Sequence, residues 1–295
     1  MLKGRLGLET ARVPQSDRHG LLWLSHGNLF AEDGTLQFTT AGSQDLPKGS
    51  YAVPYQMLSC ILLEPGTTVT HDALRLLASH GTGLMAVGTG AIRMYASMPF
   101  GPDASARARM HARLWADGTG SRVHIARRMY AWRLGEVFPN AEIAVLRGIE
   151  GARMKEIYRE LSSSFGITWR GRRYDRAAPD TADLANQAIN HAAVAVRAAA
   201  QVAVAVTGTI PQLGFIHEDS GISFALDVAD MFRDRVTLPA AFSAVRQCTP
   251  NDNLERLVRQ ATSALLRKEK VVASMIDRIK ELFDGDDGGG DAERP

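Results

Sequence analysis

Short runs of alternating apolar and polar residues fill the first third of the chain, which is the pattern of half-buried β-strands. Asp33 and Gly34 separate two of these runs and predict a hairpin turn, because both residue types tolerate positive φ angles. A helix is predicted at residues 71–79, where leucines recur at helical spacing after Thr70, a favourable N-cap. The predicted strands are residues 21–24, 27–31, 35–40, 59–63, 83–87 and 91–95. We therefore expect two small sheets packed as an N-terminal β-sandwich-like domain with one helix.

The pattern changes after residues 98–103, whose Pro and Gly content is typical of a linker. Almost every later segment has apolar residues at helical spacing. The predicted helices are residues 104–118, 122–136, 142–165, 181–207, 223–233, 237–247 and 252–282. The fold class is therefore a two-domain α+β protein, with a β-rich domain at 1–97 and an all-α catalytic domain at 104–283. Residues 284–295 are rich in Gly and Asp, which predicts a disordered acidic tail.

Positive charge is concentrated in the middle of the chain, although the whole protein carries only +2. Residues 101–176 contain 14 Arg and one Lys against eight acids. Arg suits phosphate recognition, because its planar guanidinium binds two oxygens at once. The two cysteines, Cys60 and Cys248, form no framework, and no signal peptide is evident, so we expect a reducing, cytoplasmic location. The most apolar run, residues 192–206, contains Arg197 and Gln201 and predicts a buried helix.

A histidine and two carboxylates form the first candidate site. His217 precedes a predicted helix that carries Asp227 and Asp230, three residues apart and therefore on one helical face, with Ser223 as the expected N-cap. Histidine with carboxylates suits Mg²⁺ or Mn²⁺ better than thiolate-preferring metals. The alternative is a solvated acidic helix end beside an ordinary loop histidine.

The second candidate is Glu150, which lies between Gly148 and Gly151 within a helical pattern. Glycine inside a helix costs about 1 kcal/mol relative to Ala, so we expect a close approach to the backbone there, or a helix that begins there. Arg147 and Arg153 flank the carboxylate, so an ion pair is an alternative to a metal ligand.

The third candidate is a loop at residues 167–175 that interleaves aromatic residues with arginines. Trp169, Tyr174, Arg172 and Arg173 suit phosphate contacts combined with base stacking. Aromatic residues that anchor the loop to the core, with solvated arginines, explain the pattern equally well.

Six motifs in these regions resemble the CRISPR-associated integrase and endonuclease family that acquires spacers, in its type I-E form. The motifs are Leu63-Glu64-Pro65-Gly66-Thr67, Arg93-Met94-Tyr95-Ala96-Ser97, Leu146-Arg147-Gly148-Ile149-Glu150-Gly151, Gly171-Arg172-Arg173-Tyr174-Asp175, Gly214-Phe215-Ile216-His217 and Phe224-Ala225-Leu226-Asp227-Val228-Ala229-Asp230. They occur in the family's order and with similar spacing, over about residues 17 to 282. Each motif is weak alone, but six in order are specific.

The resemblance implies that Glu150, His217 and Asp230 hold a catalytic Mg²⁺ or Mn²⁺ ion, with Asp227 as a further catalytic residue. We expect Asp227 to act as an outer-sphere base or to hold the DNA end. The implied reaction joins the 3′-hydroxyl ends of a captured double-stranded DNA to CRISPR repeat DNA by transesterification, in antiviral defence. Because His217 must be neutral to bind a metal ion, activity is expected to fall below about pH 6.5. A branched-DNA repair nuclease and a non-catalytic DNA-binding subunit are the alternatives.

The implied assembly is a homodimer, two copies of which flank a dimer of a small ferredoxin-like partner in a heterohexamer. Apolar Leu29 and Phe30 are candidates for the dimer interface. The implied DNA contacts are Arg93, Arg147, Tyr174, Arg172 and Arg173. His26, Thr68, Ser121, Pro179, Arg197 and Ser220 depart from the family's residue types at DNA-contacting positions. The metal ligands therefore match the family, whereas the residues that read the DNA motif do not.

Overall fold

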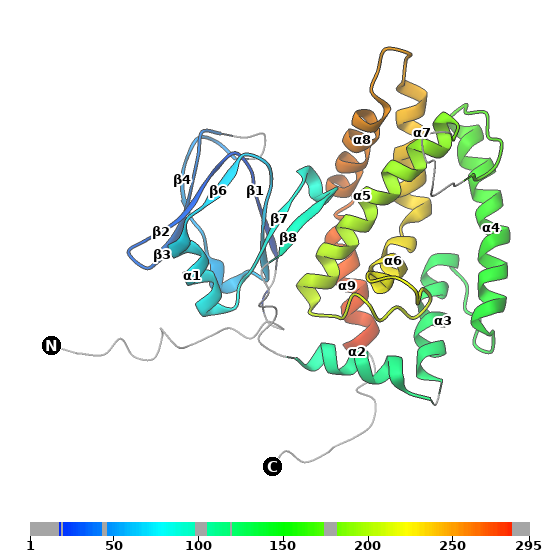
Figure 1. The fold of residues 1–295 in the computed structure, drawn as a ribbon, viewed down its shortest axis with the longest axis horizontal. Coiled ribbons are helices and arrows are strands. Elements are labelled where there is room, and N and C mark those ends of the chain that lie inside the picture. The colour runs from blue at the N-terminus through cyan, green and yellow to red at the C-terminus, as the bar shows by residue number, and fades with distance from the viewer. Residues whose placement is uncertain are drawn as a thin grey trace. The chain divides into compact units, whose positions relative to one another are not determined.

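The computed structural model describes residues 18, 20–42, 46–97, 105–118, 120–173 and 182–284, and it divides into two compact units (Figure 1). The first unit comprises the chain up to Gly88 together with Tyr95–Ser105. The second comprises Thr89–Met94 and the chain from Ala106 onward. The predicted linker at 98–103 and nearly all of the predicted tail lie outside the described residues. Those two predictions therefore stay predictions.

Two four-stranded sheets make up the first unit. In sheet order, the strands of one are β1 (Leu21–Leu24), β5 (Cys60–Leu63), β7 (Gly83–Val87) and β8 (Met94–Ser97), and those of the other are β4 (Gly49–Ala52), β3 (Thr35–Thr40), β2 (Gly27–Glu32) and β6 (Thr67–Val69). Strands β1, β5 and β7 run parallel, whereas β2 and β3 form an antiparallel hairpin. The hairpin turn is confirmed, with φ angles of 49° at Asp33 and 75° at Gly34.

The core of this unit joins residues of both sheets to helix α1 (His71–His80). Thr70 caps α1 by accepting a hydrogen bond from the Ala73 N–H, as predicted. Leu29 is fully buried in this core, so the prediction that it is an exposed dimer contact is wrong. A strand-rich N-terminal region is therefore confirmed, while the sandwich-like packing stays a prediction.

Three strand predictions need correction. The strand expected at 91–95 is present as β8 but begins only at Met94, because Thr89–Ala91 form a 3₁₀ turn. Gly90 has a φ of 67°, and a Cβ atom there would lie 2.3 Å from the Ser263 hydroxyl. This close approach explains why the segment belongs to the helical unit. Strands β4 and β6 escaped prediction because their sequences, Gly-Ser-Tyr-Ala and Thr-Thr-Val, contain no run of apolar residues.

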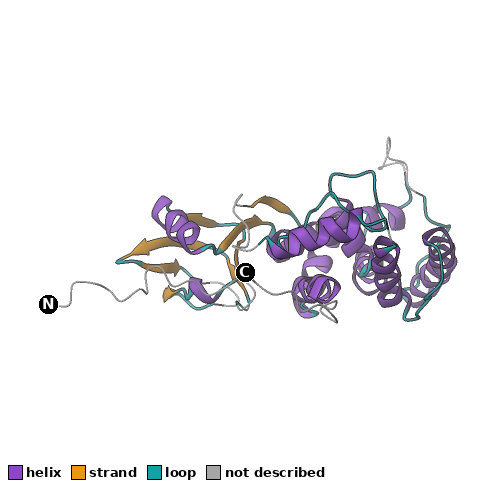
Figure 2. Ribbon diagram, turned by 90° about the horizontal axis from the view of Figure 1, so that it is seen from below, coloured by secondary structure: helices purple, strands orange, loops and turns teal. Residues whose placement is uncertain are grey.

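From Ala106 onward, the described part of the second unit consists of helices and loops (Figure 2). Its helices are α2 (Ala106–Ala116), α3 (Ser121–Leu134), α4 (Ile143–Ser164), α5 (Leu184–Thr207), α6 (Ser223–Asp230), α7 (Leu238–Gln247), α8 (Leu254–Lys268) and α9 (Val271–Asp284). Helix α5 contacts α6, α7, α8 and α9, which makes it the central helix (Figure 1). By length and composition alone α5 could cross a membrane, but 61% of its most apolar window is buried inside the protein. This agrees with the predicted buried helix.

Two helix predictions were too long. The helix expected at 252–282 is divided into α8 and α9, because Lys270 has a left-handed φ of 48°. The helix expected at 223–233 ends at Asp230 and gives way to a π-helical turn at Arg233–Thr237. Ser223 is the first residue of α6 rather than its N-cap, since Ile222 occupies that position.

Candidate metal and DNA site

Asp227 holds the loop that carries His217. Its side chain is 0% exposed, and its oxygens accept hydrogen bonds from the backbone N–H groups of Phe215 (2.6 Å), Ile216 (3.0 Å) and His217 (2.9 Å). It also contacts the His217 Nδ1 atom at 2.7 Å. These contacts give Asp227 a structural place. Its expected role as an outer-sphere base or a DNA contact stays a prediction.

The contact with Asp227 also determines which nitrogen of His217 is free. Since the carboxylate only accepts hydrogen bonds, Nδ1 carries the proton and Nε2 keeps its lone pair in the neutral ring. Nε2 lies 3.8 Å from Oδ2 of Asp230, and the ring is 40% exposed. The hydrogen bond to Asp227 raises the pKa of His217, an effect that burial of the ring opposes. His217 and Asp230, predicted as two ligands, are therefore neighbours.

A buried histidine that sequence reasoning missed supports the same loop from helix α2. His111 accepts a hydrogen bond from the Ile210 N–H through Nδ1 (3.2 Å) and therefore donates through Nε2 to the Leu213 carbonyl (2.6 Å). Its ring stacks on Phe215 with the centroids 5.1 Å apart. Burial lowers the pKa of His111 to about 4, so the ring is neutral at pH 7. No motif marks His111, because its partners are backbone groups about 100 residues away.

Further side chains from α2, α3 and α4 bind the carbonyls of this loop. Trp115 donates to the Gly214 carbonyl at 2.9 Å, and Arg147 donates to the Ile216 carbonyl at 2.5 Å. Arg122 contacts the Phe215 carbonyl at 3.4 Å and forms an ion pair with Glu218. Side chains therefore hold both N–H groups and carbonyls of the His217 loop when no ligand is bound.

Glu150 lies on α4 and pairs with an arginine that the motifs did not indicate. Arg133, in the last turn of α3, has a side chain that is only 7% exposed. Its Nη2 atom lies 2.7 Å from Glu150, and its Nη1 atom lies 3.5 Å from Asp230. Glu150 therefore does form an ion pair, but with Arg133 and not with the flanking Arg153, which pairs with Glu136. Arg133 links two of the three predicted ligands.

The two glycines beside Glu150 leave one face of α4 open. Helix α4 begins at Ile143, so the explanation that a helix begins at these glycines is wrong. A Cβ atom at Gly148 or Gly151 would meet no described atom within 4 Å. The described part of the protein therefore makes no close approach to these glycines, and their face of α4 is open, whereas Glu150 lies on another face and turns toward Arg133.

The residue types at this site suit a divalent ion, but their side chains are not close enough together to share one. Two carboxylates and a neutral imidazole suit Mg²⁺ or Mn²⁺, and the Asp227–His217 pair is a typical support for a metal-binding histidine. Among the described residues, no three His, Cys, Asp or Glu side chains are close enough together to hold one ion. The three-ligand set therefore stays a prediction.

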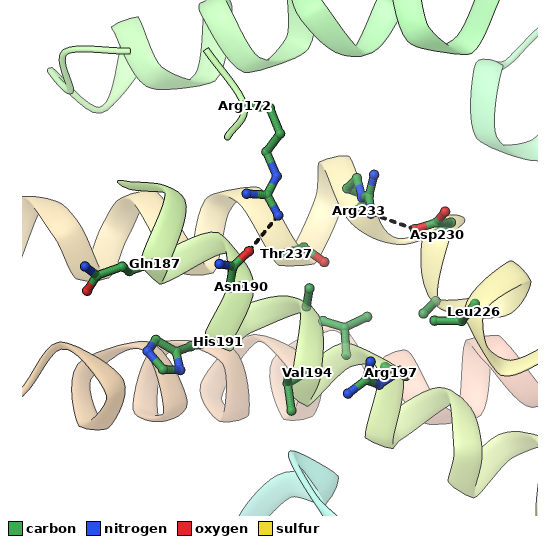
Figure 3. A pocket seen from close by; sticks show the side chains of 13 residues that line it. Arg172, Gln187, Asn190, His191, Val194, Arg197, Leu226, Asp230, Arg233 and Thr237 are labelled. Carbon is green, nitrogen blue, oxygen red and sulfur yellow. Dashed lines mark hydrogen bonds and ion pairs between the residues drawn. The ribbon is translucent and has the colours of Figure 1, made fainter. Parts of the chain in front are cut away.

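Arginines line a pocket of about 550 Å³ next to Asp230 (Figure 3). Arg172 reaches into it while donating to Asn186 (2.9 Å) and Asn190 (2.7 Å). Arg233 contacts Asp230 at 3.1 Å. The other lining residues are Gln187, His191, Ala193, Val194, Val196, Arg197, Leu226, Ala229 and Thr237. The pocket thus combines cationic groups with an apolar wall.

The remaining predicted DNA contacts have mixed outcomes. Arg93 forms an exposed ion pair with Glu255 at 2.7 Å. The backbone N–H of Arg173 donates to Asn186 at 2.9 Å. Tyr174 lies outside the described residues, as does Pro179. Trp169 stacks on Tyr158 at 4.9 Å, so the interpretation of an anchored loop holds for this tryptophan.

The other departures from the family pattern are now placed. Ser121, the first residue of α3, contacts Asp117, and Thr68 contacts Asn28. Ser220 exchanges hydrogen bonds with Ser223, while Arg197 lines the pocket described above. His26 has a positive φ of 54°. What these positions do to bound DNA stays a prediction.

The protein is therefore of the α+β class, with a strand-rich N-terminal region and a helical C-terminal region. The helical region holds a histidine–carboxylate cluster beside an arginine-lined pocket. The profile of the family described as CRISPR associated protein Cas1 matches residues 133–270. A CRISPR-associated endonuclease Cas1 from Escherichia coli K12 is 34% identical over 92% of this chain and 87% of that protein. One from Clostridium sp. SY8519 is 33% identical over 91% and 87%. The chain belongs to the Cas1 family.

Solved structures agree with this assignment. A crystal structure of a TtCas1–DNA complex has a TM-score of 0.80, with 31% identity, over 93% of this chain and all of that one. A casposase bound to an integration product has a TM-score of 0.63 at 15% identity, over 94% of this chain and all of that one. The second similarity concerns the fold alone.

Proposed function

We propose that this protein is a metal-dependent CRISPR-associated endonuclease and integrase of spacer acquisition. The observation that carries the proposal is the orientation of His217: Asp227 holds its Nδ1, so its Nε2 is free beside Asp230. Similarity over most of the chain to relatives named as CRISPR-associated endonucleases supports the same function.

Glu150, His217 and Asp230 would hold one Mg²⁺ or Mn²⁺ ion. A bound ion would lower the pKa of the attacking hydroxyl group and neutralise charge that develops on the phosphate. In the proposed reaction, a 3′-hydroxyl of the captured DNA attacks a phosphodiester of the repeat, one P–O bond forms, and the bond to another 3′-oxygen breaks. Because one phosphodiester replaces another, the reaction needs no nucleotide hydrolysis.

The chain's own residues would place the DNA for this reaction. The open face of α4 at Gly148 and Gly151 would let a DNA backbone approach the helix that carries Glu150. Arg172 and Arg197 in the pocket beside Asp230 would bind phosphates near the reacting bond. Arg147 donates to the Ile216 carbonyl and so would position the His217 loop, in addition to its expected contact with DNA.

The proposed assembly keeps the expectations drawn from the family resemblance. The protein would act as a homodimer, and two such dimers would flank a dimer of a small ferredoxin-like partner in a heterohexamer. This complex would bind double-stranded DNA with 3′ ends together with CRISPR repeat DNA. The solved TtCas1–DNA complex supports the DNA-binding part of this proposal.

An integration assay tests the proposal. The protein and its small partner are incubated with a short duplex, Mg²⁺ or Mn²⁺ and a supercoiled plasmid that carries the repeat. Wild type should insert the duplex, whereas Glu150→Ala and His217→Ala should abolish insertion and leave DNA binding largely intact. Insertion by either variant would refute the site.

The same assay separates the alternatives. Cleavage of Holliday junctions without the small partner and without repeat preference would indicate a branched-DNA repair nuclease. DNA binding by the wild type with no divalent-dependent cleavage or insertion would indicate a non-catalytic subunit.

A further inference from the structure

Arg133 occupies the space where two of the proposed ligands meet. Its guanidinium contacts Glu150 through Nη2 at 2.7 Å and Asp230 through Nη1 at 3.5 Å. Asp230 also faces Nε2 of His217 at 3.8 Å. The Nη2 atom of Arg133 is buried and makes no hydrogen bond of good geometry. The link between Arg133 and Glu150 is therefore mainly electrostatic, and another cation could replace it.

Among the described residues, Glu150, Asp230 and His217 are not close enough together to share one ion. Ligands in adjacent positions of an octahedral site lie about 3 Å apart, because each is about 2.1 Å from the ion. Arg133 instead contacts Glu150 with one nitrogen and Asp230 with another, so these oxygens face a guanidinium. A divalent ion shared by both carboxylates would have to take the place of these contacts.

The charge balance leads to the same conclusion. Glu150 and Asp230 face two guanidinium groups, those of Arg133 and Arg233. Without Arg133, two partly buried carboxylates would share the single guanidinium of Arg233, which is costly in a region of low dielectric. A divalent ion would therefore stabilise the site more when Arg133 is absent than when Arg133 is present.

We infer that Arg133 is a positioning residue that competes with the divalent cation for Glu150 and Asp230. This inference rests on the proposed function, because it assumes that these carboxylates are ligands. It assigns Arg133 two roles: it neutralises the carboxylates before the cation binds, and it weakens cation affinity. Once displaced, its guanidinium would remain near the site, where a DNA phosphate could bind it.

Mn²⁺ titration of the full-length protein tests the inference without an activity measurement. Isothermal calorimetry gives the affinity, and thermal unfolding with and without Mn²⁺ gives the stabilisation. Arg133→Met keeps the aliphatic length but removes the charge, and we expect it to bind Mn²⁺ about tenfold more tightly than wild type. Without Mn²⁺ this variant should melt at a lower temperature, and Mn²⁺ should raise its Tm by more than that of wild type.

Arg127→Met is the matched control, because Arg127 lies on the same helix and contacts Ala141 and Glu142 instead of the proposed ligands. Its Mn²⁺ affinity should equal that of wild type. Arg133→Lys keeps a charge but cannot bridge two carboxylates, so it should bind Mn²⁺ about threefold more tightly than wild type. If Arg133→Met does not fold, the Mn²⁺ affinity of Arg133→Lys tests the inference instead.

Equal or weaker Mn²⁺ binding by the Arg133 variants overturns the inference. Glu150→Gln separates this failure from that of the proposed function. If Glu150→Gln loses Mn²⁺ binding while the Arg133 variants match wild type, the ligand set stands and only the competition is refuted. If Glu150→Gln binds Mn²⁺ as wild type does, or if wild type does not bind it, both proposals fail.

Discussion

Asp227→Asn changes one atom of a buried carboxylate and should have a large effect on stability. One oxygen of Asp227 accepts the N–H groups of Phe215 and Ile216, and the other accepts the N–H and Nδ1–H of His217. An amide nitrogen in either position would face two donors. The substitution therefore removes two of the four hydrogen bonds, whichever way the amide group is turned.

The magnitude follows from these contacts. Each lost hydrogen bond to a buried charge costs about 1.5–3 kcal/mol, so we expect the free energy of unfolding to fall by about 3–6 kcal/mol. This is a large share of the roughly 5–15 kcal/mol that stabilises a typical protein. For a unit of this size the Tm should fall by about 10 °C.

Urea and thermal unfolding, followed by circular dichroism at 222 nm, measure the effect. Glu218→Gln is the matched control, because it makes the same chemical change in the same segment at a half-exposed ion pair with Arg122. The control should lose less than about 1 kcal/mol. In Asp227→Asn the pKa of His217, measured by NMR, should also fall. A loss by Asp227→Asn as small as that of the control would refute the structural role of Asp227.

Three further predictions concern pH and the helix that carries Glu150. The hydrogen bond to Asp227 raises the pKa of His217, so Mn²⁺ affinity should fall as the pH decreases through a midpoint above the ordinary value of 6.5. Mn²⁺ titrations at a series of pH values measure this midpoint, and a midpoint at or below 6.5 would contradict the prediction. His111 has a pKa of about 4 in the folded protein and binds a proton more readily in the unfolded chain. Its neutral ring therefore contributes up to about 3 kcal/mol to the free energy of unfolding, a contribution that is complete above pH 6.5 and is lost as the pH falls towards 4. Urea unfolding should show a weaker acid dependence for His111→Gln, and an unchanged dependence would rule out a neutral buried ring. Gly151→Ala should stabilise the protein by about 1 kcal/mol and weaken DNA binding in a fluorescence polarisation assay, whereas unchanged DNA affinity would mean that DNA does not approach this face.

Local sequence signals predicted those features that depend on neighbouring residues. The Asp33-Gly34 turn and the Thr70 cap needed only the conformational preferences of residues close in the chain. The corrected elements depend on distant contacts or on unfavourable backbone angles. Lys270 adopts a left-handed conformation that a lysine seldom favours, so no residue type marks the break between α8 and α9.

The candidate site divides in the same way. His217 and Asp230 were predicted from motifs and lie together in the structure. The role of Asp227 was not predictable, because its partners are backbone N–H groups that carry no sequence signature. Arg133 was missed because its contact with Glu150 joins two helices through side chains 17 residues apart, within a segment already rich in arginine.

The central claim is that one divalent ion binds between Glu150, His217 and Asp230. Crystals soaked in Mn²⁺ and measured for anomalous scattering test it directly. We expect one anomalous peak about 2.1 Å from Nε2 of His217 and from the carboxylates of Glu150 and Asp230, with Asp227 still bound to Nδ1 of His217. A peak coordinated by Asp227, or no peak among these three side chains at saturating Mn²⁺, would contradict it.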